Sequence, residues 1–221
     1  MQLLGARVDT AVSYGLKLVG GAQRIERCNG FDIERLGGQT ATRSLLRALP
    51  HDRQDTLARH PHHIVALVLD ATGDAESALA NGCCRPAALI AANPDQSLTL
   101  TERVKPGERL CWAIRRPDTS ETDMCNTLDR LDASRATRIP PACMLMFSCI
   151  GRGPYFYGGD DRDLALVRLR YPQLPVLGTY STGQIAPSRC GEIRRNRLLQ
   201  NSVVTAFISP ANREPNVQSI T

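Results

Sequence analysis

Residues 142–163 read ACMLMFSCIGRGPYFYGGDDRD, and this stretch decides the expected fold. Its first part is apolar and does not alternate with polar residues, which is typical of a strand buried on both faces. Gly151-Arg152-Gly153-Pro154 ends that strand. Acidic residues then precede an apolar pattern that predicts a helix from about residue 160 to residue 170. A buried strand that leads into a helix predicts a layered α/β domain.

The flanking sequence predicts further helices and strands. Capping residues and apolar spacing predict helices over residues 40–49 and 118–136. Short apolar runs bounded by turn residues predict strands over residues 62–70, 87–93, 96–102, 103–116, 174–185 and 202–209. Asn29-Gly30 stands between two strand-like segments and is typical of a two-residue type I′ hairpin. The sequence therefore predicts the α/β class in a mixed α+β form, with a layered mixed β-sheet, flanking helices and an antiparallel hairpin region.

Composition and charge argue against several classes of protein. The net charge of the 221 residues is only +5, and the basic residues are spread along the chain with only two lysines, Lys17 and Lys105. Nucleic-acid binding usually needs clustered positive charge, so we expect no nucleic-acid partner. No run of 18 apolar residues occurs, so we expect no membrane span. Because residues 1–10 contain no apolar leader, we expect a cytoplasmic protein.

The cysteines and histidines lack the spacing of a catalytic or metal site. The eight cysteines include no C-x-x-C pair, and all four histidines lie within residues 51–63. Reduced thiols, with no metal and no cofactor, are the simplest interpretation. Cys149 stands at the end of the predicted strand, where catalytic nucleophiles often lie, but no histidine is close in sequence. We expect no enzymatic activity and keep a Cys149-dependent enzyme as an alternative.

The glycines of the opening stretch do not form a phosphate-binding loop. Gly153 and Gly158 have the separation of a P-loop, but Gly159-Asp160 follows where Lys-Ser/Thr is required. Gly151-Arg152-Gly153 lacks the third glycine of a dinucleotide-binding fingerprint. We interpret the three aspartates within residues 160–163 as a helix cap, because negative side chains stabilise the free amides of a helix N-terminus.

A ligand pocket is the remaining hypothesis for this stretch. Glycines at a strand end allow a ligand to approach the backbone closely. The guanidinium of Arg152 suits a carboxylate, and Tyr155, Phe156 and Tyr157 offer flat apolar walls with polar tips. Loops at the carboxyl ends of strands are the usual binding place in open α/β sheets. The alternative, that these aromatic side chains pack on a neighbouring domain, stays open.

Several motifs resemble the C-terminal domain of FIST proteins. Residues 147–152 (FSCIGR) are similar to the family's F-S-C-x-G-R element. Residues 174–178 (LPVLG) and 183–185 (GQI) are similar to its P-x-x-G-x-x-x-x-G-E-I element, and residues 196–204 resemble its final strand. Gln184 departs from the family, which often has Glu at this position. The resemblance covers most of residues 30–209.

The resemblance implies three segments and a sensory role. Residues 1–25 would be the remnant of a preceding FIST N-terminal domain, residues 26–209 a FIST C-terminal-like domain and residues 210–221 a polar tail, so we expect a fragment of a longer protein. FIST domains are understood as intracellular sensory modules of signal transduction, found in bacteria with histidine kinases or chemotaxis receptors. We expect a bacterial protein with such a partner that binds a small molecule such as an amino acid. A non-catalytic scaffold or interaction domain that packs on a missing N-terminal half is the alternative.

Six residues are candidates for the ligand site of this sensory hypothesis. Arg152 would pair with an anionic group of the ligand. Three tyrosines would form the walls of the pocket, and two amides would donate hydrogen bonds. These five residues are Tyr155, Tyr157, Tyr180, Gln184 and Asn201. A neutral Gln184 is unsuited to any role that needs a carboxylate, such as binding an amine.

Overall fold

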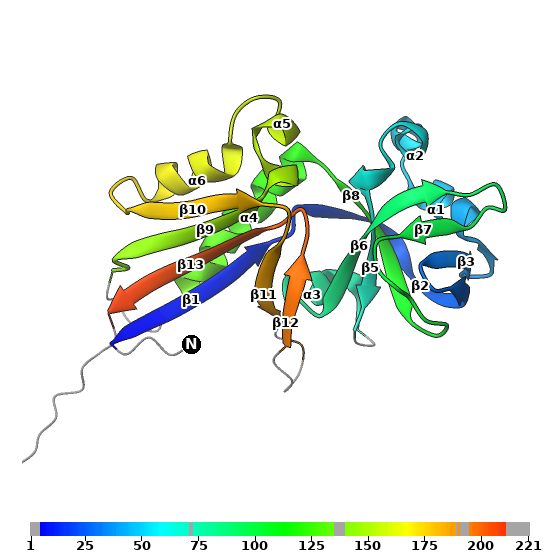
Figure 1. Cartoon of the computed structure of the whole chain (residues 1–221), viewed down its shortest axis with the longest axis horizontal. Helices are drawn as coiled ribbons and strands as arrows, with labels where there is room; N and C mark the ends of the chain where they lie inside the picture. Colours follow the sequence, from blue (N-terminus) through cyan, green and yellow to red (C-terminus); the bar gives the residue numbers. More distant parts are fainter. Residues whose placement is uncertain (1–4, 71–72, 135–139, 189, 191–194, 211–221) are drawn as a thin grey trace, which may run out of the picture. The chain divides into compact units, whose positions relative to one another are not determined.

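The structure is a computed structural model that describes residues 5–70, 73–134, 140–188, 190 and 195–210 (Figure 1). Within these residues the chain forms two compact units that alternate along the sequence. We call them the sheet unit, which takes residues up to 14, 121–184 and from 200 onward, and the barrel unit, which takes residues 15–120 and 185–199. Each unit is described by itself.

The barrel unit contains most of the strands. Its strands are β2 (Leu16–Asn29), β3 (Asp32–Leu36), β4 (Gln39–Thr40), β5 (Ile64–Leu69), β6 (Cys84–Ala92), β7 (Leu98–Leu100), β8 (Arg109–Arg115), and β12 (Arg195–Leu199) paired with β11 (Gln184–Ser188). Its α-helices are α1 (Ala41–Ala48), α2 (Thr56–Arg59) and α3 (Ala75–Ala80), with 3-10 turns η1 (His51–Arg53) and η2 (Pro61–His63).

Six strands of the barrel unit close into a ring. Their order is β2-β8-β5-β6-β7-β3, and β2 also pairs with β3, which joins the two ends. β2 can pair with both β8 and β3 because its register with β8 shifts between Val19 and Gln23. Gly20 lies in this bulge with φ of 72°, a conformation that favours glycine. The predicted antiparallel hairpin region is therefore part of a barrel with no free edge among these six strands.

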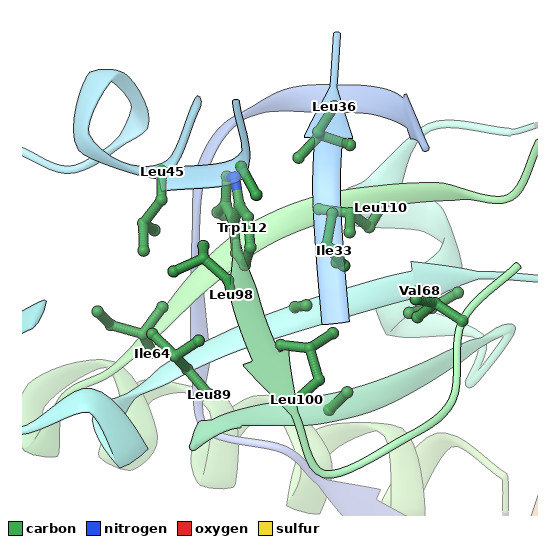
Figure 2. Packing of buried hydrophobic residues seen from close by; sticks show 14 of the residues in the cluster. Ile33, Leu36, Leu45, Ile64, Val68, Leu89, Leu98, Leu100, Leu110 and Trp112 are labelled. Carbon is green, nitrogen blue, oxygen red and sulfur yellow. The ribbon is translucent and has the colours of Figure 1, made fainter. Parts of the chain in front are cut away.

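The barrel interior is a single apolar cluster (Figure 2). Trp112 of β8 is fully buried there, and its Nε1–H donates to the hydroxyl of Ser44 on α1 (3.1 Å). That hydroxyl in turn donates to Oε1 of Gln23 on β2 (2.9 Å). Leu45, also on α1, lies beside Trp112 in the cluster. Helix α1 is thus fixed to the barrel by both apolar packing and a buried hydrogen-bond chain.

The sheet unit is a two-layer arrangement of strands and helices. Its strands are β1 (Ala6–Ser13), β9 (Cys143–Cys149), β10 (Val176–Ser181) and β13 (Val203–Pro210), and its helices are α5 (Pro154–Tyr157), α6 (Arg162–Arg170) and most of α4 (Pro117–Ala133), with the 3-10 turn η3 (Ile150–Arg152). The strand order is β1-β13-β9-β10; β10 runs parallel to β9, and the other two pairings are antiparallel.

Both long helices of the sheet unit cover the same face of the sheet. Met144 and Met146 of β9 pack in one cluster with Leu128 of α4, Val167 of α6 and Phe207 of β13. Register pairs these positions on one face: Met144 lies opposite Phe207, and Met146 lies opposite Thr205. The helices predicted over 118–136 and 160–170 therefore form as α4 and α6 and cover the sheet, although residues 135–136 lie outside the described residues.

Among the described residues, no helix of the sheet unit covers the other face of this sheet, which we call the bare face. By register it carries fifteen positions and no charged side chain: Ala6, Val8, Thr10, Val12, Cys143, Leu145, Phe147, Cys149, Leu177, Thr179, Ser181, Val204, Ala206, Ile208 and Pro210. Phe147 is 37% exposed and Leu177 is 71% exposed. The prediction that β9 is buried on both faces holds only in part: on the face without helices Cys149 is buried, but Phe147 is exposed.

The α/β prediction in its mixed α+β form is confirmed, but local details differ. The strand predicted over residues 174–185 is two strands, β10 and β11, in separate sheets, and the strand predicted over 103–116 begins only at Arg109. The hairpin between β2 and β3 forms, but its two loop residues are Gly30-Phe31, with positive φ only at Gly30 (62°). That is the pattern of a type II′ turn, in which glycine takes the first loop position, and not of the expected type I′ turn. Leu169, expected to point inward, is 81% exposed.

The predicted segment boundaries do not follow the compact units. The boundary after residue 25 falls inside β2, which continues to Asn29. The predicted tail lies, apart from residue 210, outside the described residues, and the family origin of residues 1–25 stays a prediction. In the part of the chain that the structure describes, no helix is long and apolar enough to cross a membrane.

Candidate functional site

The stretch that follows β9 folds as its local signals predict. η3 leads into α5, which has Pro154 at its first turn and ends at Gly158 with φ of 87°. Glycine favours this left-handed position at a helix end. Asp161 then caps α6, its carboxylate accepting a hydrogen bond from the backbone N–H of Leu164 (2.9 Å). The predicted helix cap is confirmed for Asp161 and not for Asp163.

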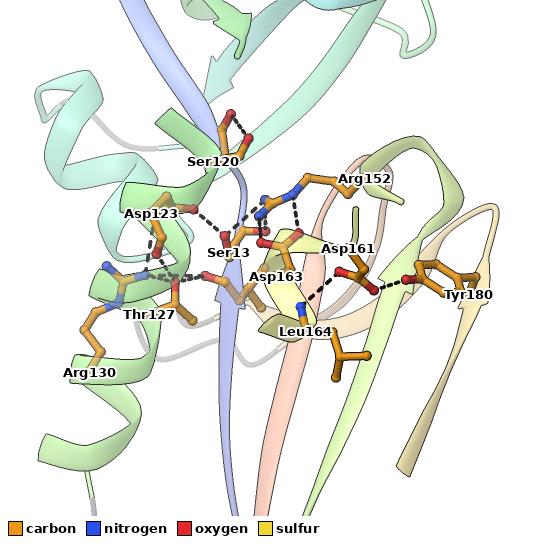
Figure 3. A network of polar contacts seen from close by, with 12 residues as sticks. Ser13, Ser120, Asp123, Thr127, Arg130, Arg152, Asp161, Asp163, Leu164 and Tyr180 are labelled. Carbon is orange, nitrogen blue, oxygen red and sulfur yellow. Dashed lines mark hydrogen bonds and ion pairs between the residues drawn. The ribbon is translucent and has the colours of Figure 1, made fainter. Parts of the chain in front are cut away.

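Arg152 and Asp163 form a buried ion pair in the sheet unit, just after the end of β9 (Figure 3). Both side chains are at most 1% exposed, and Nη2 and Nε of Arg152 donate to the two carboxylate oxygens at 2.7 and 3.1 Å. Nη1 of Arg152 donates to the hydroxyl and the carbonyl oxygen of Ser13 on β1 (3.1 and 3.3 Å). The Ser13 hydroxyl donates to Asp123 on α4 (2.8 Å).

This network gives Arg152 a structural role. Its guanidinium ties the start of α6 to β1, and through Ser13 to α4, so it fixes the helices on the sheet. Burial raises the pKa of Asp163, and the adjacent Arg152 opposes that rise. A ligand carboxylate would have to displace Asp163 to reach Arg152. The ligand-binding role expected for Arg152 is therefore not provided by this arrangement.

The predicted tyrosines separate from one another. Tyr155 and Tyr157 lie on the four-residue helix α5, where Tyr155 is 97% exposed and Tyr157 is buried. The hydroxyl of Tyr157 lies near Arg152 and Asp163 but makes no hydrogen bond of standard geometry. Burial raises the pKa of Tyr157. Tyr180 lies elsewhere, on β10, with its ring against the backbone of Gly153. The three tyrosines do not form walls of one pocket.

The two predicted amides lie near the ends of β11 and β12. The amide nitrogen of Gln184 donates to Ser181 (3.1 Å), and its carbonyl oxygen accepts from Ser202 (3.1 Å), while the side chain is only 3% exposed. Asn201 has φ of 55°, a left-handed conformation that asparagine tolerates better than most residues, in the turn before β13. Gln184 therefore joins neighbouring loops, as a buried amide with both groups paired.

A groove of about 210 Å³ lies in the sheet unit between α6 and strands β9 and β10. Its lining combines apolar and polar side chains: Met146, Ser148, Asp161, Leu164, Arg168, Val176, Gly178, Thr179 and Tyr180. Gly178 forms part of the groove because only glycine fits there. A Cβ atom at this position would lie 1.8 Å from the carbonyl oxygen of Met146.

The groove has an acidic end and a basic end. Near one end, the hydroxyl of Tyr180 hydrogen-bonds to the carboxylate of Asp161 (Figure 3). Burial, then this hydrogen bond, raises the pKa of Tyr180. Near the other end is Arg168, for which no hydrogen bond or ion pair with another described residue is present. The arrangement can bind an anionic group at Arg168 and a hydrogen-bond donor at Asp161.

Sequence reasoning found Tyr180 and missed the other polar residues of the groove. The sequence contained a signal for Asp161 and Arg168. Leu164 follows Asp161 by three residues and Arg168 follows it by seven, and this spacing places all three on one face of a helix. Asp161 was interpreted as a cap alone, although one of its carboxylate oxygens caps α6 and the other contacts Tyr180.

Catalytic and metal-binding arrangements find little support in the described residues. The thiol of Cys149 is buried and contacts the carbonyl oxygen of Thr182 (3.7 Å). All four histidines lie in the barrel unit, so the sheet unit offers no histidine base to this thiol. In the described part of the chain, no group of three histidine, cysteine, aspartate or glutamate side chains is arranged to hold a metal ion.

Comparison with known proteins gives the family. The model of the FIST C domain matches residues 41–187, which is well over half of the chain. The chain belongs to the FIST C domain family. The resemblance inferred from the FSCIGR and LPVLG motifs is thus confirmed, and the match includes Arg152, Asp163 and the groove beside β10, whereas Ser13 lies outside it. FIST C domains are associated with signalling.

Curated relatives of this FIST C domain are mycobacterial proteins. An uncharacterized protein of Mycobacterium bovis, Mb0898c, is 26% identical over 191 residues, which are 85% of this chain and 48% of the relative. An uncharacterized protein of Mycobacterium tuberculosis, Rv0628c, is 24% identical over 191 residues, with the same coverage. The chain spans about half the length of the curated relatives it matches.

Proposed function

We propose that this FIST C domain is a non-enzymatic, cytoplasmic sensory domain whose ligand site is the groove between α6 and β10. The observation that carries the proposal is Arg168, a cation without an ion partner among the described residues, at a groove that also contains Asp161 and Tyr180. Ligand sites in proteins combine apolar walls with a few polar groups that fix orientation, and this groove has both. The association of the family with signalling supports the same function.

The size and charge of the groove suit a small anionic or zwitterionic molecule. Its volume of about 210 Å³ is below the roughly 300–1,000 Å³ of sites for drug-sized ligands. Arg168 would bind the carboxylate, and Met146, Leu164 and Val176 would contact the apolar part of the ligand. Amino acids are therefore the first ligand class to test. In this proposal Arg168 binds the anionic group of the ligand, the role that the sequence-based hypothesis gave to Arg152.

Isothermal titration calorimetry of the full chain against the twenty amino acids tests the proposal. We expect binding that is lost in Arg168→Gln and retained in Leu169→Gln, because Leu169 is the exposed neighbour of Arg168 on α6 and does not line the groove. An Arg168→Gln variant that binds like the parent would refute the assigned site. Failure of every amino acid to bind would refute this ligand class.

A scaffold function is the second candidate, and the bare face of the sheet favours it. This face is uncharged, and it exposes Phe147 and Leu177. Exposed apolar surfaces of this kind are typical of interaction sites. Calorimetry also separates the two functions, since a pure scaffold would bind no small molecule.

A further inference from the structure

β10 is an edge strand without the usual protection against further pairing. Within the sheet it pairs only with β9, and its sequence, VLGTYS, contains no charge and no proline. The opposite edge strand, β1, carries the ion pair Arg7–Asp9. Charges on edge strands are a common way to prevent another strand from adding to a sheet. β10 is therefore the edge of this sheet that is open to strand addition.

The groove lies between α6 and the side of β9 and β10 that faces this helix, and its charged ends are far apart. Asp161 and Arg168 are seven residues apart on α6, which corresponds to about 10 Å along the helix axis. A single amino acid carries its amine and carboxylate on one carbon, so an amino acid bound at Arg168 would leave the Asp161 end of the groove unfilled. Three residues of an extended peptide, at about 3.3 Å each, span this distance.

We propose that an extended segment of a partner protein adds to β10 as a fifth strand, with one of its carboxylates bound to Arg168. The proposal rests on the groove assigned above as the ligand site and names its occupant. Strand addition would supply affinity through backbone hydrogen bonds along β10. Charge complementarity with Arg168 would select for an acidic group.

The two faces of β10 define the sequence that such a segment needs. Side chains of a strand alternate between faces, so every second residue of the segment would point to the α6 side of the sheet, beside the groove and toward Arg168. The residues between them would lie on the bare face, next to Leu177 and Thr179. The partner segment is therefore expected to carry apolar residues at alternate positions and an acidic residue among those that face α6.

The test uses random ten-residue peptides displayed on phage and selected on the full chain. We expect selected peptides with this alternation and an acidic residue. A synthetic copy of one such peptide is then N-methylated at one position at a time, which removes single backbone donors. Strand addition predicts loss of binding at every second position, because only one edge of the peptide donates to β10.

Two matched pairs of variants test the site. Arg168→Glu should weaken binding about tenfold or more, and replacing the acidic residue of the peptide by lysine should restore it, whereas Leu169→Glu should have little effect. Leu177→Lys should block binding, whereas Val8→Lys, on the same face at the other edge, should not.

The outcomes separate this inference from the proposed function. Selection of no peptide, or binding that is indifferent to N-methylation, overturns strand addition. If free amino acids still bind and Arg168→Gln abolishes that binding, the proposed ligand site stands while the inference fails. A third outcome is that no peptide is selected, the chain self-associates, and Leu177→Lys abolishes this association. In that case β10 pairs with a second copy of the chain, which also overturns the proposed occupant.

Discussion

Removing one partner of the Arg152–Asp163 pair should destabilise the sheet unit strongly. The two side chains are 0% and 1% exposed and share two hydrogen bonds. Arg152→Met keeps most of the side-chain volume but leaves the carboxyl group of Asp163 buried without its cation. Breaking a buried pair in this way costs about 3–5 kcal/mol. The double variant Arg152→Met/Asp163→Leu should recover most of that loss, because no buried charge remains.

The recovery should be incomplete. Arg152 also donates to the carbonyl oxygen of Ser13, which the double variant leaves without this donor. An unsatisfied buried group costs about 1–3 kcal/mol, so the double variant should remain about that much less stable than the parent. Arg170→Met is the control, because Arg170 pairs with Asp132 near the surface, where a pair contributes about 1 kcal/mol or less.

The assay is hydrogen–deuterium exchange of peptides from β9, β13 and α6 under native conditions and in urea. This readout follows the sheet unit, whereas fluorescence of Trp112, the only tryptophan, follows the barrel unit. A loss below about 1 kcal/mol in Arg152→Met, or a double variant no more stable than the single one, would refute the assigned structural role. If Arg152→Met leaves the stability of the sheet unit unchanged but abolishes ligand binding, then Arg152 is a ligand-binding residue, as the sequence-based hypothesis predicted.

Three further predictions concern single residues. Gly178→Ala should destabilise the sheet unit in the same exchange assay, because its Cβ would lie 1.8 Å from a backbone oxygen of β9, whereas Gly73→Ala meets nothing within 4 Å and should be tolerated. Burial lowers the pKa of His63 from 6.5 to about 4, so between these pH values the unfolded chain binds a proton that the folded chain does not. Stability monitored by fluorescence of Trp112 should therefore fall as the pH drops through this range, by about 1–2 kcal/mol after allowance for solvent screening, and His63→Gln should reduce that fall. Ser44→Ala removes the acceptor of the buried indole N–H and should cost about 1–3 kcal/mol in urea unfolding; a smaller loss would mean that another acceptor replaces it.

Local features of this chain were predictable because their causes lie within a few residues. Asp161 caps the third residue after it, and glycine occupies the hairpin between β2 and β3. The apolar spacing of residues 118–136 anticipated a helix whose Met124, Leu128 and Leu131 are buried. Caps, turns and amphipathic helices depend on neighbours in sequence, so pattern alone indicates them.

The surroundings of the predicted site residues could not be predicted, because their partners are distant in sequence. A strand-end arginine suits a ligand carboxylate and an internal aspartate equally well, and here the aspartate lies eleven residues later, with Ser13 added from the first strand. Tyr155 and Tyr157 look equivalent in sequence but differ completely in burial. Which group reaches which partner depends on packing, and that is a property of the whole unit.

The sequence by itself determined the family, the mixed α+β class and most of the helices and strands, because motif order, periodicity and capping are local. Only the tertiary structure decided that β2 closes a barrel by pairing with both β8 and β3. It also decided that Arg152 is buried in an ion pair, while Arg168 lies at the groove without an ion partner among the described residues. Two charges of the same type differ in role because burial makes an unpaired charge too costly in one place, and solvent permits it in the other.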